Sequence, residues 1–307
     1  MPLLPPASPV RPVPFATIGF SRDLPLLRLQ ARSFALHLAE EPGRRIWVVN
    51  NDNAPRAFED AFRAEVLPLY GPHAAQVGLI WRGDVVPGFD KASGWRRQQV
   101  LKWGMSRVVG PGLYLTLDSK NCLVRPWRDR DLFTPDGRVR MQRRRLDRTL
   151  AGSFHYFVPP DPAATVSEPR YVSSIWTPYA LWTRHVTAMM EEIERREGIS
   201  AYEALATRES FFEYALYWAF LVSRGADALY DLHAPYFFAG FWFKDGEDAE
   251  VVLRTLAQPT IAWFGLHRQI GRSGSGLRDR IATFLAERGL FASTEAARAS
   301  LDALAGD

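Results

Sequence analysis

The stretch that decides the fold runs from Leu113 to Asn121 and reads LYLTLDSKN. Its first five residues are apolar or β-branched, which is typical of a buried strand, and Asp118 follows that strand directly. Polar residues then begin a turn. In open α/β proteins, ligands bind beyond the C-terminal ends of the strands. We therefore expect Asp118 to lie on the ligand-binding edge of a sheet.

Earlier parts of the chain alternate between strand and helix patterns. We predict strands over 15–20, 46–49 and 77–81, and helices over 24–39, 54–66 and 93–108. This alternation indicates an open, mostly parallel, twisted sheet flanked by helices. The asparagine-rich turn from Asn50 to Asn53 follows the second strand, so we expect it on the same edge as Asp118.

The second half has a more mixed pattern. Thr177 and Pro178 resemble an N-cap and the first residue of a helix that ends near Arg196. The basic stretch 138–148 is expected to be a solvated helix or loop; the alternative is that it borders the site. The remaining predicted elements are a strand over 153–158, an aromatic helix over 210–223, extended segments over 228–233, 237–243 and 260–266, and two helices within 277–304.

Composition excludes several classes of protein. A net charge of +4, from 38 basic and 34 acidic residues, is too small to indicate a nucleic-acid partner. The single cysteine, Cys122, excludes an intramolecular disulfide and a cysteine-cluster metal site. No run of 18 apolar residues predicts a membrane span, and the proline-rich stretch 1–14 resembles an irregular tail rather than a signal peptide. We expect a cytoplasmic protein.

Familiar catalytic motifs are also missing. The sequence contains no GxGxxG, GxxxxGK[ST], GxSxG or HExxH. These absences argue against a dinucleotide dehydrogenase, a P-loop NTPase, an α/β-hydrolase and a zincin.

Two segments at predicted strand ends carry polar groups suited to phosphate or metal. Asp118 could bind a divalent ion or a ribose, and Lys120 could neutralise phosphate. The alternative for Asp118 is a purely local role as a turn cap. His267 and Arg268 follow the extended segment 260–266, and His267 could ligate a metal or donate to a diphosphate; the alternative is an ordinary polar residue.

Two helices offer further candidates. Trp95, Gln98, Gln99 and Lys102 share one stripe of the helix 93–108 and could form the wall of a polar cleft; the alternative is a solvated face. Glu213 lies among aromatic residues, where loss of solvent makes a carboxylate a better proton acceptor. Together with Ser210 it also fits a capping box, and both interpretations stay open.

Four motifs in order carry a resemblance. They are GWRRQQVLK at 94–102, YLTLDSKN at 114–121, FEYALY at 212–217 and GLHR at 265–268. The chain resembles a bacterial family of uncharacterised, GT-A-like glycosyltransferases over about residues 15–290. The resemblance implies a single GT-A-like domain over 15–307, with a nucleotide-binding half (15–126) and an acceptor-side half (127–307).

The same resemblance implies a function and a set of site residues. The protein would move a sugar from a nucleotide-diphosphate sugar to a hydroxyl of a glycan or small-molecule acceptor, as in surface polysaccharide synthesis. Asp118 and Glu213 would be catalytic. The donor would be bound by Asp118, Lys120, Asn121, Lys102, Gln98, Trp95, Arg268 and Asn51.

The metal site of such enzymes is where this sequence departs from the pattern. The D-x-D hallmark holds Mn²⁺ or Mg²⁺, but its third position is Lys120 here, which can pair with a diphosphate directly. If a metal is used, its ligands would be Asp118, Asn121 and His267. Trp176 and Trp242 are either an acceptor platform or core residues. The alternative function is a catalytically inactive GT-A-like domain that binds a glycan or a partner.

Overall fold

The computed structural model describes residues 12–88, 93–160, 171–241, 249–268, 270 and 275–304. Most of the predicted N-terminal tail, and Trp242, lie outside these residues. No helix within the described ranges combines the length and apolarity needed to cross a membrane.

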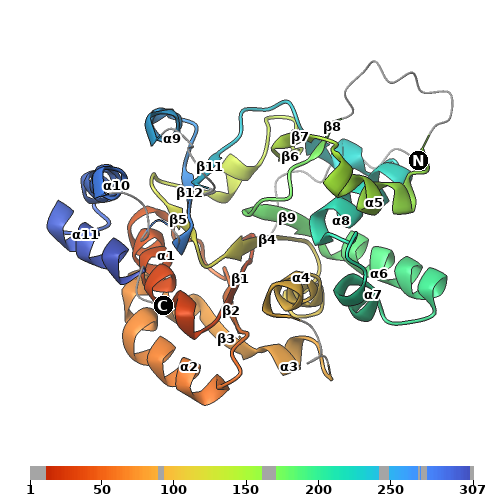
Figure 1. Cartoon of the computed structure of the whole chain (residues 1–307), viewed down its shortest axis with the longest axis horizontal. Coiled ribbons are helices and arrows are strands. Elements are labelled where there is room, and N and C mark those ends of the chain that lie inside the picture. The colour runs from red at the N-terminus through yellow and green to blue at the C-terminus, as the bar shows by residue number, and fades with distance from the viewer. Residues whose placement is uncertain are drawn as a thin grey trace. The chain divides into compact units, whose positions relative to one another are not determined.

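A five-stranded sheet with the order β3-β2-β1-β4-β9 forms the centre of the described fold (Figure 1). Its strands are β1 (Phe15–Gly19), β2 (Ile46–Asn50), β3 (Val77–Trp81), β4 (Leu113–Asp118) and β9 (Tyr179–Trp182). The sheet is mostly parallel and helices flank it, whereas β9 runs antiparallel to β4. Residues of β1 and β4 are buried on both faces, as expected for strands covered on both sides. The predicted α/β class is therefore confirmed.

Helices occupy most of the predicted helical segments, and side-chain caps explain several of their starts. Ser93 caps α4 by accepting a hydrogen bond from the backbone N–H of Arg96, and Asp147 caps α5 through the N–H of Leu150. The helices are α1 (Leu24–His37), α2 (Pro55–Ala61), α3 (Arg82–Val85), α4 (Gly94–Gly104), α5 (Arg148–Phe157), α6 (Thr183–Glu197), α7 (Ala201–Thr207), α8 (Glu213–Ser223), α9 (Ala249–Ala257), α10 (Ser275–Glu287) and α11 (Thr294–Ala303).

Shorter strands form three small sheets outside the central one. They are β5 (Asn121–Leu123), β6 (Val139–Arg140), β7 (Arg143–Arg145), β8 (Tyr171–Ser173), β10 (Tyr230–Asp231), β11 (Phe238–Phe241) and β12 (Trp263–Leu266). β12 lies between β11 and β5, parallel to the first and antiparallel to the second. In that pairing Gly265 lies opposite Asn121, so the turn after β4 continues into the edge of this small sheet.

The chain divides into two compact units that interleave along the sequence. The first unit comprises Met1–Ala16, Ile80–Thr116 and Asp129–Pro235, and the second comprises Thr17–Leu79, Leu117–Arg128 and Tyr236–Asp307. In the second unit, apolar residues of β5, β12, α10 and α11 form one buried cluster that includes Val124, Phe264 and Leu285. In the first unit, α8 is buried along almost its whole length.

Two predicted boundaries in the second half of the sequence are wrong. Residues 153–157 belong to helix α5 instead of a strand, because Asp147 caps a helix whose buried positions Leu150, Phe154 and Phe157 recur at helical spacing. Thr177 and Pro178 do not start a helix. The residues after them form β9, which pairs with β4, and α6 begins at Thr183.

The basic stretch 138–148 is also different from the prediction. It contains β6 and β7 before α5 begins, and β7 pairs antiparallel with β8. Arg143 and Arg145 of β7 are exposed, whereas Arg144 between them is half-buried.

Candidate functional site

One buried glutamine of α1 holds the turn that follows β4 through hydrogen bonds to its backbone. Gln30 is fully buried, and its Nε2 donates to the carbonyl oxygens of Asp118, at 3.1 Å, and Asn121, at 2.9 Å. The hydroxyl of Thr17 on β1 donates to Gln30 Oε1 at 3.0 Å. The backbone N–H of Asp118 donates to Asn121 Oδ1 at 2.7 Å. These bonds fix the direction in which the Asp118 side chain leaves the strand.

The side chain of Lys120 forms an ion pair with Asp118. Its Nζ lies 2.9 Å from Asp118 Oδ2, and the two side chains are only 15% and 21% exposed. A charge-assisted contact at this depth is stronger than a surface ion pair because solvent screens it less. The strand end therefore presents a carboxylate and an ammonium side by side.

His267 and Arg268 join this pair from a distant part of the sequence. The backbone N–H of Leu266 donates to the carbonyl of Lys120 at 2.8 Å, so the segment after β12 begins beside the turn. Burial lowers the pKa of His267, the charges of Lys120 and Arg268 lower it further, and Asp118 opposes them. The imidazole is therefore neutral at neutral pH, in a cationic setting.

His267 lies close enough to Asp118 for the carboxylate to raise its pKa, although the two residues do not follow strands of one sheet. β12 is not a strand of the parallel sheet. The antiparallel pairing of β12 with β5 brings the two segments together, because β5 starts at Asn121, directly after the turn.

Asp23 is a buried carboxylate of this cluster that sequence reasoning missed. It directly precedes α1 and is 6% exposed. The pKa of Asp23 is raised to about 6. Burial is the largest cause, and the charge of Asp118 also raises the pKa. The hydrogen bond with Ser119 and the charges of Arg268 and Arg22 lower it. The sequence signal was its position between the first strand and the proline-started helix.

The Asn50–Asn53 turn is tied to the end of β1. The backbone N–H of Asn51 donates to Gly19 O at 2.9 Å, and that of Ser21 donates to Asp52 Oδ2 at 2.7 Å. Asn51 is 7% exposed. This predicted donor-binding residue is thus held at the end of the neighbouring strand, in the same unit as Asp118.

A small basic pocket opens beside the start of α1. Its volume is about 220 Å³, and it includes the guanidinium groups of Arg22, Arg28 and Arg268. Arg28 pairs with Glu65 at 2.5 Å. Ser21, Leu24, Pro25, Ala303 and Leu304 complete the lining. Arg268 belongs both to this pocket and to the groups around Asp23, so it links the pocket to the strand end.

The candidate base, Glu213, lies in the first unit and forms an ion pair. Its Oε1 is 3.2 Å from Lys102 Nζ, and the side chains are 9% and 6% exposed. Lys102 Nζ also lies 5.0 Å from the centre of the Tyr214 ring. The capping-box interpretation is wrong, because α8 begins at Glu213 and its N-cap is Phe212 rather than Ser210.

The other predicted residues of α4 have mixed surroundings. Trp95 is 54% exposed and packs edge-on against Phe212, with ring centres 5.9 Å apart. Gln98 is half-buried, whereas Gln99 is 2% exposed. Lys102 is buried with Glu213, so the predicted stripe runs from solvent into the interior.

Trp176, half-buried between β8 and β9, donates its backbone N–H to Ser174 Oγ at 3.4 Å.

The predicted site residues therefore form two groups, one in each unit. Asp118, Lys120, Asn121, His267, Arg268 and Asn51 belong to the second unit, and Glu213, Lys102, Gln98 and Trp95 belong to the first.

The predicted metal ligands fit a cation poorly. Asn121 Oδ1 already accepts from the backbone of Asp118, and Asp118 faces the ammonium of Lys120. In the described part of the chain, no three acidic, histidine or cysteine side chains gather as a metal site. Like charges repel, so a divalent ion beside Lys120 would be disfavoured.

Comparison with known families decides membership. Residues 23–237, well over half of the chain, match the model of a family of unknown function, DUF6492. The chain belongs to this family. The match covers Asp23, Asp118 and Glu213, whereas His267 and Arg268 lie beyond its end. No curated protein matches the chain by sequence.

Two solved structures are distantly similar. The apo form of mouse xyloside xylosyltransferase 1 is 13% identical, with a TM-score of 0.41, over 82% of this chain and 97% of that one. The galactosyltransferase LgtC, in complex with donor and acceptor sugar analogues, is 12% identical, with a TM-score of 0.42, over 83% of this chain and 87% of that one.

Proposed function

We propose that this DUF6492 protein is a GT-A-like glycosyltransferase that moves a sugar from a nucleotide-diphosphate sugar to a hydroxyl acceptor. The observation that carries the proposal is the convergence of Lys120, His267 and Arg268 around Asp118 at the end of β4. Its support from the sequence is the set of motifs around the same residues.

The donor is held by the second unit in this proposal. Asp118 accepts hydrogen bonds from the ribose hydroxyls, as an acidic residue at a strand end can. Lys120 and Arg268 pair with the diphosphate and take the place of a metal ion, since both can make charge-assisted hydrogen bonds to phosphate oxygens. Neutral His267 adds a ring N–H donor. Arg22 extends the positive charge along the pocket.

The bond changes balance without a further reactant. The acceptor oxygen forms a bond to the anomeric carbon of the sugar, and the bond from that carbon to the diphosphate breaks. The nucleoside diphosphate leaves with the electron pair, and the cations of Lys120 and Arg268 stabilise its new charge. Glu213 is the proposed base that takes the hydroxyl proton, on the strength of its motif FEYALY at 212–217.

A screen with nucleotide sugars tests this function. Purified protein is heated with UDP-, GDP-, ADP- and dTDP-linked sugars, with and without Mn²⁺, because a specific ligand raises the melting temperature by mass action. The stabilising sugar is then incubated with the protein, and released nucleotide is measured. Stabilisation followed by release of nucleotide supports a transferase. Absence of stabilisation by every donor contradicts the proposal.

A binding domain without catalysis is the second candidate. Two observations favour it: Lys120 replaces the second acid of D-x-D, and the carboxylate of Glu213 is engaged by Lys102. This candidate predicts stabilisation by a nucleotide sugar or glycan with no release of nucleotide above the uncatalysed rate.

A further inference from the structure

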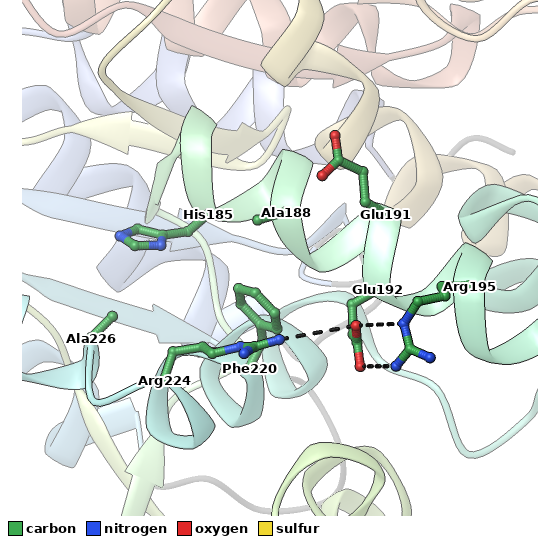
Figure 2. A pocket seen from close by; sticks show the side chains of 8 residues that line it. All are labelled: His185, Ala188, Glu191, Glu192, Arg195, Phe220, Arg224 and Ala226. Carbon is green, nitrogen blue, oxygen red and sulfur yellow. Dashed lines mark hydrogen bonds and ion pairs between the residues drawn. The ribbon is translucent and has the colours of Figure 1, made fainter.

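A larger pocket in the first unit takes no part in the proposed function. Its volume is about 530 Å³, within the range of pockets that hold small organic molecules. It lies between α6 and the end of α8 (Figure 2). It is lined by His185, Ala188, Glu191, Glu192, Arg195, Phe220, Arg224 and Ala226.

One ion pair of the lining is already satisfied internally. Glu192 accepts from Arg195 at 2.8 and 3.1 Å and from Arg196 at 2.7 Å. These hydrogen bonds lower the pKa of Glu192 to about 2. Glu192 and Arg195 are therefore paired with each other, and we expect them to contribute little to ligand binding.

Arg224 makes the longer of the contacts that the lining arginines form with Glu192. Its Nη2 lies 4.0 Å from Glu192 Oε2, at the limit of an ion pair, and its side chain is 56% exposed. The guanidinium carbon lies 5.4 Å from the centre of the Phe220 ring, and Figure 2 shows Arg224 extending past that ring toward Glu192. A planar guanidinium held against an aromatic ring is prepared for a two-point contact with a carboxylate.

His185 supplies a second donor. Burial and, to a smaller extent, the charge of Arg184 lower its pKa to about 4, so the ring is neutral at neutral pH. Arg184 Nε lies 3.2 Å from His185 Nε2. A guanidinium can only donate, so Nε2 accepts and the ring proton is on Nδ1.

The rest of the lining limits the charge and shape of a ligand. Phe220, Ala188 and Ala226 give an apolar surface. Glu191 is exposed, and within the described residues it forms no ion pair. Its negative charge repels a dianion such as phosphate more than it repels a single carboxylate.

We propose that this pocket binds a small organic monocarboxylate with a hydrocarbon body. The carboxylate contacts the Arg224 guanidinium and the Nδ1–H of His185. The hydrocarbon part lies against Phe220, Ala188 and Ala226. The site is independent of the proposed sugar transfer, because its ligand and its lining residues are different.

Calorimetric titration of the full chain with butanoate, hexanoate and octanoate tests the ligand class. Affinity is expected to rise with chain length, by up to about fourfold for each added methylene that is buried. Hexan-1-ol, hexylamine and inorganic phosphate are the comparison ligands and are expected to bind more weakly than hexanoate. Equal binding of hexan-1-ol, tighter binding of phosphate, or no saturable binding of octanoate overturns the proposal.

Substitutions then test the named contacts. Arg224→Gln is expected to weaken hexanoate binding at least about tenfold, since it removes a charge-assisted contact. Arg145→Gln removes an exposed arginine of the same unit outside the pocket and is the matched control. Glu191→Gln is expected to strengthen binding about twofold to fivefold. Unchanged affinity in Arg224→Gln contradicts the assignment.

NMR spectroscopy of the parent chain tests the same site without relying on the folding of a variant. Adding hexanoate should shift the imidazole NMR signals of His185 and leave those of His73, which is buried in the second unit, unchanged. Saturable binding without a shift at His185 places the ligand elsewhere and refutes the proposed site.

Discussion

Replacing Asp23 with asparagine changes a buried carboxyl of the second unit whose pKa is raised. The carboxyl is 6% exposed, and burial is the largest cause of its raised pKa. Asparagine has nearly the same shape and can still accept a hydrogen bond from Ser119 through its amide oxygen. The variant therefore removes the buried charge while keeping the packing.

The magnitude follows from the difference between the two pKa values. The pKa is 3.8 in a free chain and about 6 in the fold, a difference of about 2 units and thus about 3 kcal/mol. The folded state keeps this proton to a higher pH than the unfolded state does. The contribution of Asp23 to the unfolding free energy therefore falls as pH rises from about 4 to about 6, and stays low above that. Below pH 4 both states are protonated, and the penalty vanishes.

Urea denaturation at pH 4, 5, 6 and 7 measures the effect. Asp23→Asn should be about 1–3 kcal/mol more stable than the parent at pH 7, the lower end allowing for lost attraction to Arg22 and Arg268, and about equal to it at pH 4. Asp60→Asn, at an exposed position of α2, is the control and should not change with pH in this way. Equal effects of Asp23→Asn at pH 4 and pH 7, or a loss of stability at pH 7, refute the reasoning.

Two further predictions concern buried polar contacts. Glu213→Gln should lower the unfolding free energy by about 3–5 kcal/mol in urea denaturation, because it removes the charge that faces the buried ammonium of Lys102. The double variant Lys102→Met with Glu213→Gln should recover most of this loss. If the losses of the two single variants simply add in the double variant, the pairing is contradicted. Gln30→Leu should lower the unfolding free energy by about 1–3 kcal/mol, because the carbonyls of Asp118 and Asn121 lose their donor; amide exchange in the 118–121 turn should accelerate, and an unchanged rate contradicts the anchoring.

The elements that could be predicted from sequence are those with strong local patterns. The apolar runs of β1, β2, β3 and β4 and the periodic helices between them gave the α/β class and placed Asp118 at a strand end. Prediction failed where tertiary contacts overrode local signals. Thr177 and Pro178 look like a helix start, but the next four residues pair with β4 as β9.

The site residues likewise differ in whether a local sequence pattern marks them. Asp118, Lys120 and His267 were recognisable because polar residues follow apolar runs, yet the pairing of β5 with β12 that joins them has no local signature. Asp23 and Gln30 were missed for a physical reason. An aspartate before a helix and a glutamine within one are common, and only burial against the 118–121 turn gives these two their importance.

In the proposed function, protein cations rather than a metal ion hold a nucleotide-diphosphate sugar at Asp118. Calorimetric titration with the best-stabilising nucleotide sugar, in EDTA and in Mn²⁺, for the parent chain and for Lys120→Ala, tests it most directly. We predict that binding persists in EDTA and that Lys120→Ala weakens it by about 1–3 kcal/mol, the scale of a lost charge-assisted hydrogen bond. Binding that disappears in EDTA and returns with Mn²⁺, while Lys120→Ala equals the parent chain, would contradict the account.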